Sequence, residues 1–194
     1  MGERLDQRNE ADQLPGEEHL LIRGAQQGDR QAFAHLVERY WDALHRWLFR
    51  LARDRHTAED LTQETFLKAL NGLHSFRPGT NFRAWLFRIA HNTFANQRRS
   101  SRPREPLPED LPLSEDGPLE KALSRESLHL LGQTVGRLPP EFKAAFLLRV
   151  DEGLSFREIG DVLGVTEETA RWRVFKARQK LMSVLAPQLD REKS

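Results

Sequence analysis

The stretch "SFREIGDVLGVTEETARWRVFKARQK", residues 155–180, predicts two short helices joined by a tight turn. Ser155 is a favourable N-cap for a first helix that runs to Leu163, and Thr166 is one for the second. Gly164 and Val165 form the turn between them. The apolar residues expected to lock the two helices together are Ile159, Val162, Leu163 and Val165, with Ala170, Val174, Ala177 and Leu181 on the inner face of the second helix. The pattern is that of a helix-turn-helix.

The remaining surface of the second helix is basic. It carries Arg171, Arg173, Lys176, Arg178 and Lys180, and residues 169–180 contain no acid. Such a face fits the major groove of DNA, where arginine contacts guanine and a glutamate such as Glu168 contacts cytosine. The alternative is a helical hairpin whose basic face is only solvated.

A second unusual stretch is "TNFRAWLFRIAHNTFANQRR", residues 80–99, which has helical spacing. One stripe predicts the core face, and the surplus arginines and aromatics lie off it. Aromatics stack on unpaired bases while arginines neutralise phosphates, which favours a single-stranded nucleic-acid surface, with Phe76 of the preceding loop beside it. The alternative for Phe87 and Phe94 is internal packing. The stripe is Phe82, Trp85, Leu86, Ile89 and Thr93, and the other surface holds Phe87, Arg88, His91, Asn92, Phe94, Arg98 and Arg99.

Residues 57–71 predict a helix with two different faces. Thr62, Phe66 and Leu70 are expected to point inward. The opposite side carries acidic and polar residues together with a leucine, which is compatible with a docking surface or with an ordinary solvated face. That side comprises Asp60, Leu61, Glu64 and Lys68, with Gln63 and Leu67 at the boundary.

The rest of the chain predicts helices and no strands. A long helix over residues 30–53 begins after the N-cap Asp29, and a shorter one precedes it. Residues 101–117 are rich in proline and acid and predict a flexible linker. The expected fold class is all-α, with one helical domain over 17–100 and a second over 118–186.

Composition narrows the function classes. The 194 residues include 38% hydrophobic and 30% charged residues, with a formal net charge of +1. That small total hides blocks of one sign, since residues 83–104 carry arginines without acids and residues 105–120 carry acids without Lys or Arg. There is no apolar run long enough to span a membrane, no secretory leader and no cysteine. No catalytic or metal-binding motif is present, so we expect a cytoplasmic protein that is not an enzyme, with no cofactor or metal.

Three segments together resemble the extracytoplasmic-function (ECF) class of bacterial sigma factors. They are "DLTQETFLKAL", "FRPGTNFRAWLFRIAHN" and "LPPEFKAAFLLRVDEGLSFREIGDVLGVTEETARWRVFKARQKL", in the order and spacing of that family. The resemblance implies two helical domains, called regions two and four, on a flexible linker. It also implies binding of core RNA polymerase through the β′ clamp helices and β flap, recognition of promoter DNA, and control by an anti-sigma factor.

The resemblance also assigns roles to residues. Asp60, Gln63 and Glu64, with Leu61 and Lys68 on the same surface, match the polymerase-binding face. Phe76 and Asn92 match residues that hold a base flipped from the −10 element, with Arg83, Arg88, His91, Arg98 and Arg99 beside the strand. The helix-turn-helix matches the segment that reads the −35 element. Its contacting residues would be Glu168, Thr169, Arg171, Trp172, Arg173, Lys176 and Arg178.

One departure from the family pattern matters. The family usually reads Thr-Val-Arg-Ser-Arg early in the recognition helix, whereas residues 169–173 of this chain read Thr-Ala-Arg-Trp-Arg, with Trp172 in place of the small serine. Trp172 either contacts the −35 DNA or packs on its own domain and changes the docking angle. A competing interpretation of the whole chain is a regulator that binds operators through the helix-turn-helix without core polymerase.

Overall fold

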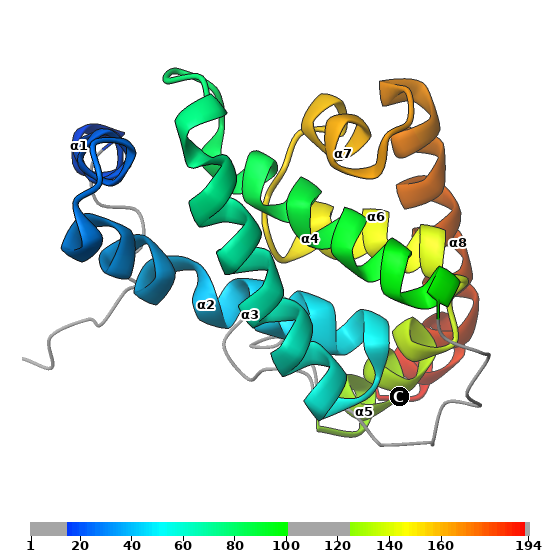
Figure 1. Cartoon of the computed structure of the whole chain (residues 1–194). Helices are drawn as coiled ribbons and strands as arrows, with labels where there is room; N and C mark the ends of the chain where they lie inside the picture. Colours follow the sequence, from blue (N-terminus) through cyan, green and yellow to red (C-terminus); the bar gives the residue numbers. More distant parts are fainter. Residues whose placement is uncertain (1–14, 101–124, 193–194) are drawn as a thin grey trace, which may run out of the picture.

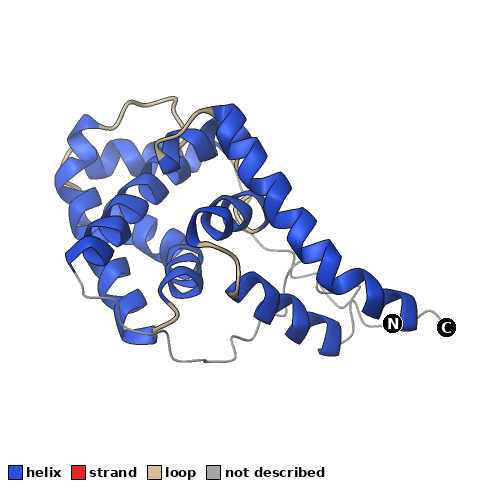
Figure 2. Cartoon of the chain, turned by 90° about the vertical axis from the view of Figure 1, so that its right-hand side faces the viewer, coloured by secondary structure: helices blue, strands red, loops and turns tan. Residues whose placement is uncertain are grey.

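The computed structural model describes residues 15–100 and 125–192, and all regular structure in these ranges is helical, as predicted. Figure 2 shows the helices joined by short loops. The predicted linker over 101–117 and the start of the second predicted domain lie outside the described residues. The helices are α1 (Pro15–Gln26), α2 (Arg30–Ala52), α3 (Arg55–Gly72), the 3-10 turn η2 (Leu73–Ser75), α4 (Phe82–Ser100), α5 (Arg125–Gly136), α6 (Pro140–Val150), α7 (Phe156–Leu163) and α8 (Glu167–Glu192).

Side-chain caps fix where the long helices begin. The Asp29 carboxylate accepts the N–H groups of Gln31 at 2.8 Å and Ala32 at 3.2 Å, which confirms the predicted N-cap of α2. Asp54 caps α3 in the same way through the Thr57 N–H at 2.8 Å, so this helix begins two residues before Thr57, the predicted start. Between them, Arg53 turns the chain in the left-handed conformation with φ of 57°.

The first group of helices, α1 to α4, is organised around α2, which contacts each of the other three. In Figure 1, α3 crosses in front of α2, and α4 lies next to α3. The interior between them holds the ring of Trp47, which contacts the edge of Phe87 at a centroid distance of 5.4 Å. Leu44, Leu48 and Leu86 are fully buried around this pair. Burial of such large apolar side chains is the main stabilising term of the group.

Small residues let α3 lie close to its neighbours. Its buried face is formed largely by Ala58, Thr62, Thr65 and Ala69, all fully buried. The Thr62 hydroxyl donates to the carbonyl of Ala58 at 2.7 Å and that of Thr65 to Leu61 at 2.6 Å. These bonds satisfy both hydroxyls inside the helix, so the threonines behave as compact core residues.

In the second group, α5 to α8, the three helices α5, α6 and α7 pack around α8. The interior of this group contains the side chains predicted from the helix-turn-helix pattern, including Ile159, Val162, Val174 and Ala177, all 2% exposed or less. Leu147 and Leu148 of α6 complete it. The two helices of the motif therefore fold on a third helix that the sequence places directly before them.

The two groups pack against each other. In Figure 1, α4 crosses in front of α6 and lies next to α7, and contacts join α4 with α7 and α2 with α6. Arg50 of α2 pairs with Asp151, and the Asn81 amide donates to Glu158 at 2.6 Å. The buried apolar residues of both groups form one continuous cluster. The surface of α4 thus becomes part of an interface between the groups.

Candidate nucleic-acid interface

The turn of the helix-turn-helix depends on two glycines. The Ser155 hydroxyl and the Glu158 carboxylate form a reciprocal capping box at the start of α7. Gly164 ends α7 in the left-handed conformation with φ of 65°. The Val165 N–H donates to the Gly160 carbonyl at 2.9 Å, and a Cβ on Gly160 would lie only 2.8 Å from the Val165 oxygen. A close backbone approach therefore sets the angle at which α8 leaves the turn.

The open side of α8 is basic, as predicted. Arg171, Lys176, Arg178 and Lys180 are exposed, and Glu168 lies exposed in the first turn of the helix. Arg171 is held by two contacts, an ion pair with Glu167 at 2.7 Å and a position over the Phe156 ring at 5.2 Å. A guanidinium held in this way loses less freedom on contacting a base edge. Thr169 is only half-buried and its N–H is capped by the Thr166 hydroxyl at 3.2 Å.

Trp172 packs on its own domain, which is one of the two alternatives that the sequence left open. Its ring meets the edge of Phe142 at a centroid distance of 5.4 Å, so it packs on α6. It nevertheless remains 51% exposed, beside Arg171 on the open side of α8. The indole is therefore anchored by its own domain and still presents an apolar face to the solvent.

Arg173 lies elsewhere than the other basic residues of α8. It is half-buried and lines a cavity between the two groups of helices together with His91 of α4. Burial lowers the pKa of His91, and the positive charge of Arg173 lowers it further. In this arrangement both residues face the interface between the groups, so neither is on the open DNA-binding surface that the sequence predicted for it.

The aromatic residues of α4 that lie outside the predicted core stripe pack in the interior. Phe87 is fully buried against Trp47, and Phe94 is 8% exposed beneath the Arg98 guanidinium at 5.8 Å. Of the two alternatives that the sequence left open for these rings, the structure therefore has internal packing. The reason is that α4 contacts α2, α3 and α7, so its buried surface is wider than the single stripe of a helix packed on one side.

Phe76 is also a core residue in this structure. Its ring is 4% exposed and meets the edges of Phe82 at 5.4 Å and Trp85 at 5.2 Å. Gln26 of α1 fixes the loop by donating to the Phe76 carbonyl at 2.9 Å. The expectation that Phe76 offers an accessible ring for a flipped base is not met in this arrangement, whereas Asn92 is exposed as predicted.

The arginines on the first half of α4 face the second group. The Arg83 guanidinium donates to the Glu152 carboxylate at 2.8 Å and lies over the Tyr40 ring at 5.5 Å. Burial raises the pKa of Glu152, against the opposing effect of Arg83. Arg88 borders a smaller cavity beside the turn after α7, with Asp161 and Gly164. The helices of the second group thus cover much of the α4 surface for which DNA contact was predicted; Arg98 and Arg99 at its end are exposed.

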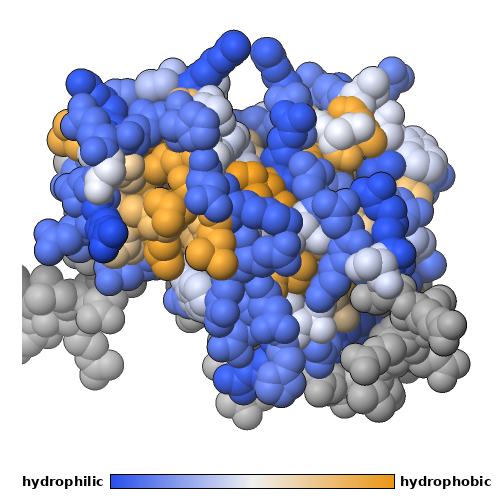
Figure 3. All heavy atoms as spheres, in the orientation of Figure 1, coloured by the Kyte–Doolittle hydropathy of each residue, from blue (hydrophilic) through white to orange (hydrophobic). Residues whose placement is uncertain are grey.

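The outer face of α3 differs from the prediction in its apolar residues. Asp60, Gln63 and Glu64 are exposed as expected. Leu61, predicted on this surface, is fully buried, while Leu70, predicted inward, is 47% exposed. Leu67 is 62% exposed, and Figure 3 shows an apolar area over α2 and α3 on this side of the molecule.

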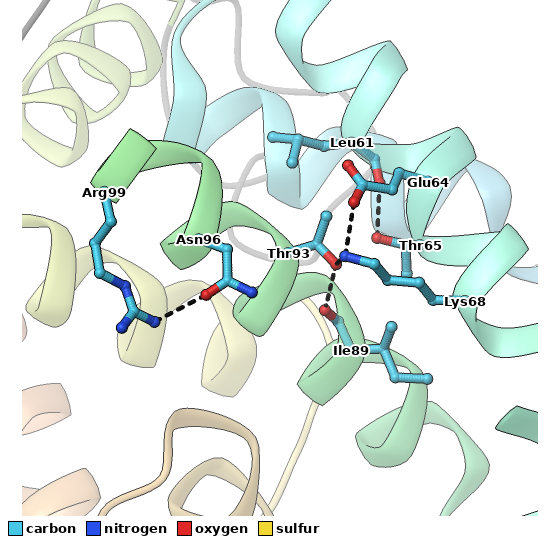
Figure 4. A network of polar contacts seen from close by, with 8 residues as sticks. All are labelled: Leu61, Glu64, Thr65, Lys68, Ile89, Thr93, Asn96 and Arg99. Carbon is cyan, nitrogen blue, oxygen red and sulfur yellow. Dashed lines mark hydrogen bonds and ion pairs between the residues drawn. The ribbon is translucent and has the colours of Figure 1, made fainter. Parts of the chain in front are cut away.

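A polar network joins this face to α4. Figure 4 shows Lys68 between the Glu64 carboxylate, at 2.6 Å, and the Thr93 hydroxyl, at 3.2 Å. Thr93 in turn donates to the Ile89 carbonyl at 2.9 Å. The ammonium group of Lys68 is therefore held by both helices, and Glu64 stays at the edge of the exposed acidic face.

No cluster of metal ligands occurs in residues 15–100 and 125–192. In the same ranges no helix is long and apolar enough to cross a membrane.

Comparison with known families and proteins matches both halves of the chain. Residues 36–104 match the family model "Sigma-70 region 2" and residues 128–181 match "Sigma-70, region 4". The chain is 34% identical to the ECF RNA polymerase sigma-E factor of Haemophilus influenzae, over 88% of this chain and 96% of that protein. It is 40% identical to the ECF RNA polymerase sigma factor SigE of Mycolicibacterium smegmatis over 82% of its own length, and spans 65% of that relative.

Solved structures give the same result. The structure of CnrH in complex with the cytosolic domain of CnrY is similar with a TM-score of 0.66 and 28% identity, covering 88% of this chain and 98% of that one. The sigma factor RpoE of Bartonella quintana, solved in complex with the anti-sigma factor NepR, has a TM-score of 0.64 and 25% identity, covering 79% of this chain and 96% of that one.

Proposed function

The chain belongs to the ECF family of RNA polymerase sigma factors, and we propose that it binds core RNA polymerase and directs it to promoters with −35 and −10 elements. The observation that carries this proposal is the presence of both sigma regions, in family order, in one chain. We take region two to span residues 17–100, the linker 101–117 and region four 118–186.

The polymerase-binding face in this proposal is the exposed side of α3. Asp60, Gln63 and Glu64 supply polar and acidic groups for the β′ clamp helices. The exposed Leu67 and Leu70 take the apolar role that the sequence had given to Leu61. A rim of charge around exposed leucines is the usual make-up of a protein–protein contact.

The promoter-binding surfaces in this proposal lie on α4 and α8. On α8, Arg171, Lys176 and Arg178 are exposed and free of the interface between the groups. On α4, Arg88 and Asn92 are exposed, while Arg83 becomes available when the two groups separate. Phosphate contacts of this kind make affinity strongly dependent on salt.

The partners follow from the same proposal. Core polymerase and promoter DNA act in the cytoplasm of a bacterium, so this chain would act there. Related structures were solved with an anti-sigma factor, and we propose a partner of that class for this chain. Sigma activity itself needs neither a cofactor nor a metal.

The experiment that tests the proposal is transcription with purified core polymerase on a library of genomic fragments from the source organism. The expected result is promoter-dependent products only when this chain is added. A library that yields no such product would refute it. Promoter binding measured without core polymerase distinguishes this proposal from the alternative, since an operator-binding regulator binds alone with full affinity.

A further inference from the structure

A cavity of about 520 Å³ lies between the two groups of helices, and its charged lining comes from both. His91, Arg98 and Arg99 belong to α4, and Arg173 belongs to α8. Glu141 at the start of α6 also borders it. The remaining walls are apolar, formed by Leu51, Phe94, Ala144 and Leu163 among others.

The positive charges in this lining are held in position without an ion pair to any carboxylate of the described residues. Arg98 lies over the Phe94 ring, and Arg99 donates to the Ala95 carbonyl and to the Asn96 side chain at 2.9 Å. Within residues 15–100 and 125–192, no carboxylate forms an ion pair with Arg98, Arg99 or Arg173. Guanidinium groups from two helices therefore share one cavity at a cost in repulsion.

The surroundings of the cavity add to its positive potential. Lys143 is 5% exposed, and its ammonium group donates to the Gly136 carbonyl at 2.8 Å. Burial lowers its pKa to about 8, with contributions from the charges of Arg53 and Arg98. The Nε of Arg53 is buried without a hydrogen-bond partner in the described part of the chain. An anion in the cavity would lower the electrostatic cost of all these groups together.

We propose that this cavity binds a small phosphate-bearing anion, of the size of pyrophosphate or a nucleotide, that bridges α4 and α8. Arginines at several angles suit the oxygens of a phosphate group, and the apolar walls suit a planar base. The volume lies within the range typical of small-molecule sites. Because each group of helices supplies part of the charge, the bound anion holds the two groups together.

Binding of the anion at this site opposes promoter binding, and this consequence rests on the proposed sigma function. His91, Arg98 and Arg99 also belong to the predicted −10 surface, and Arg173 to the predicted −35 surface. A ligand that keeps them on the interface between the groups competes with promoter DNA for the same residues. Separation of the groups opens the cavity, so the anion and the promoter bind different arrangements of the chain.

Binding is tested on the full chain by calorimetry with inorganic pyrophosphate and with ADP, at constant ionic strength. We expect saturable binding of at least one probe, weakened at least tenfold by Arg173→Gln and by Arg99→Gln. Arg157→Gln, an exposed arginine on α7, is the matched control and retains the affinity of the parent chain. No saturable binding, or equal loss in all three variants, would overturn the proposal.

Whether the anion holds the two groups of helices together is tested by measuring the distance between α3 and α8. Because the chain has no cysteine, Gln63→Cys and Gln179→Cys place single dyes on exposed positions of α3 and α8. Energy transfer between them is expected to rise with the bound probe and to stay unchanged in Arg173→Gln. A short single-stranded oligonucleotide that binds as tightly as the small probes while energy transfer falls would assign these arginines to nucleic acid instead. None of these measurements needs polymerase, so failure here leaves the transcription test of the proposed function intact.

Discussion

Arg83 of α4 and Glu152 of the loop after α6 are joined by a hydrogen-bonded ion pair of 2.8 Å, with the carboxylate side chain only 2% exposed. The two residues lie in segments that match different family models, region two and region four. Arg50 and Asp151 form a second pair beside them. The packed arrangement of the two regions is therefore held by specific polar contacts as well as by apolar burial.

Breaking these pairs should shift the chain toward separated regions. In Asp151→Asn combined with Glu152→Gln, the neutral side chains no longer attract Arg50 and Arg83, and promoter binding in the presence of core polymerase should strengthen severalfold. Small-angle scattering should show a larger radius of gyration. Asp42→Asn, an exposed acid on α2, is the control and should change neither quantity. An unchanged radius in the double variant contradicts the expectation.

Substitutions at two leucines of α3 should affect stability and polymerase binding separately. Leu61 is fully buried, so Leu61→Ala should lower the free energy of unfolding by about 2–5 kcal/mol. Leu67 is 62% exposed, so Leu67→Ala should leave stability within about 0.5 kcal/mol and weaken binding to core polymerase. Denaturant unfolding and a pull-down with core enzyme measure the two effects. Equal losses of stability would show that the face is assigned wrongly.

The turn of the helix-turn-helix should not accept a side chain at Gly160. A methyl group there would lie 2.8 Å from the Val165 oxygen, so Gly160→Ala should destabilise the protein by about 1–3 kcal/mol. At Gly72 the added methyl would meet only the Trp85 ring at 3.7 Å, so Gly72→Ala should be tolerated. Thermal unfolding of both variants checks the contrast.

Trp172 should influence which −35 sequence is used. Trp172→Ser removes the half-exposed indole and its contact with Phe142, so the preferred −35 bases should change while the fold is kept. Transcription from a promoter library randomised at the −35 element measures the change. Met182→Ser, at a position of α8 with 55% exposure, should leave the preference as it is. The same preference in Trp172→Ser and the parent chain would mean that the indole contacts no base.

Lys143 should make stability depend on pH. Its pKa is about 8 in the folded chain and 10.5 when unfolded, so the unfolded state holds the proton more tightly. Stability should therefore rise as the pH increases from about 8 to 10.5, by at most about 1.4 kcal/mol per pH unit. Lys143→Met should remove this rise, and Lys176→Met, on the exposed face of α8, should keep it. Urea unfolding across this range is the measurement.

Most local structure was predictable because it depends on neighbours in sequence. The N-cap at Asp29, the capping residue Ser155 and the left-handed Gly164 all act within one turn of a helix. The inner face of α8 was predictable for the same reason, since Ala170, Val174 and Ala177 recur at helical spacing and pack on one side.

The faces of α3 and α4 were harder to predict because each helix lies between others. Besides Leu61 and Phe66, the buried side of α3 holds two alanines and two threonines, which do not stand out from a solvated face in a hydrophobic pattern. On α4, burial on several sides enclosed Phe87 and Phe94, which fall outside the single stripe. The positions of Arg83, His91 and Arg173 depend on how region two meets region four, which no local pattern encodes.

The small residues along α3 have a mechanical consequence. A helix held on two sides by alanines and by threonines bonded to their own backbone has little room to roll about its axis. The backbone positions of its outward residues, Asp60, Gln63 and Glu64, are therefore fixed before any partner arrives. Binding on this side therefore loses little backbone conformational entropy, so more of the contact energy is available for association.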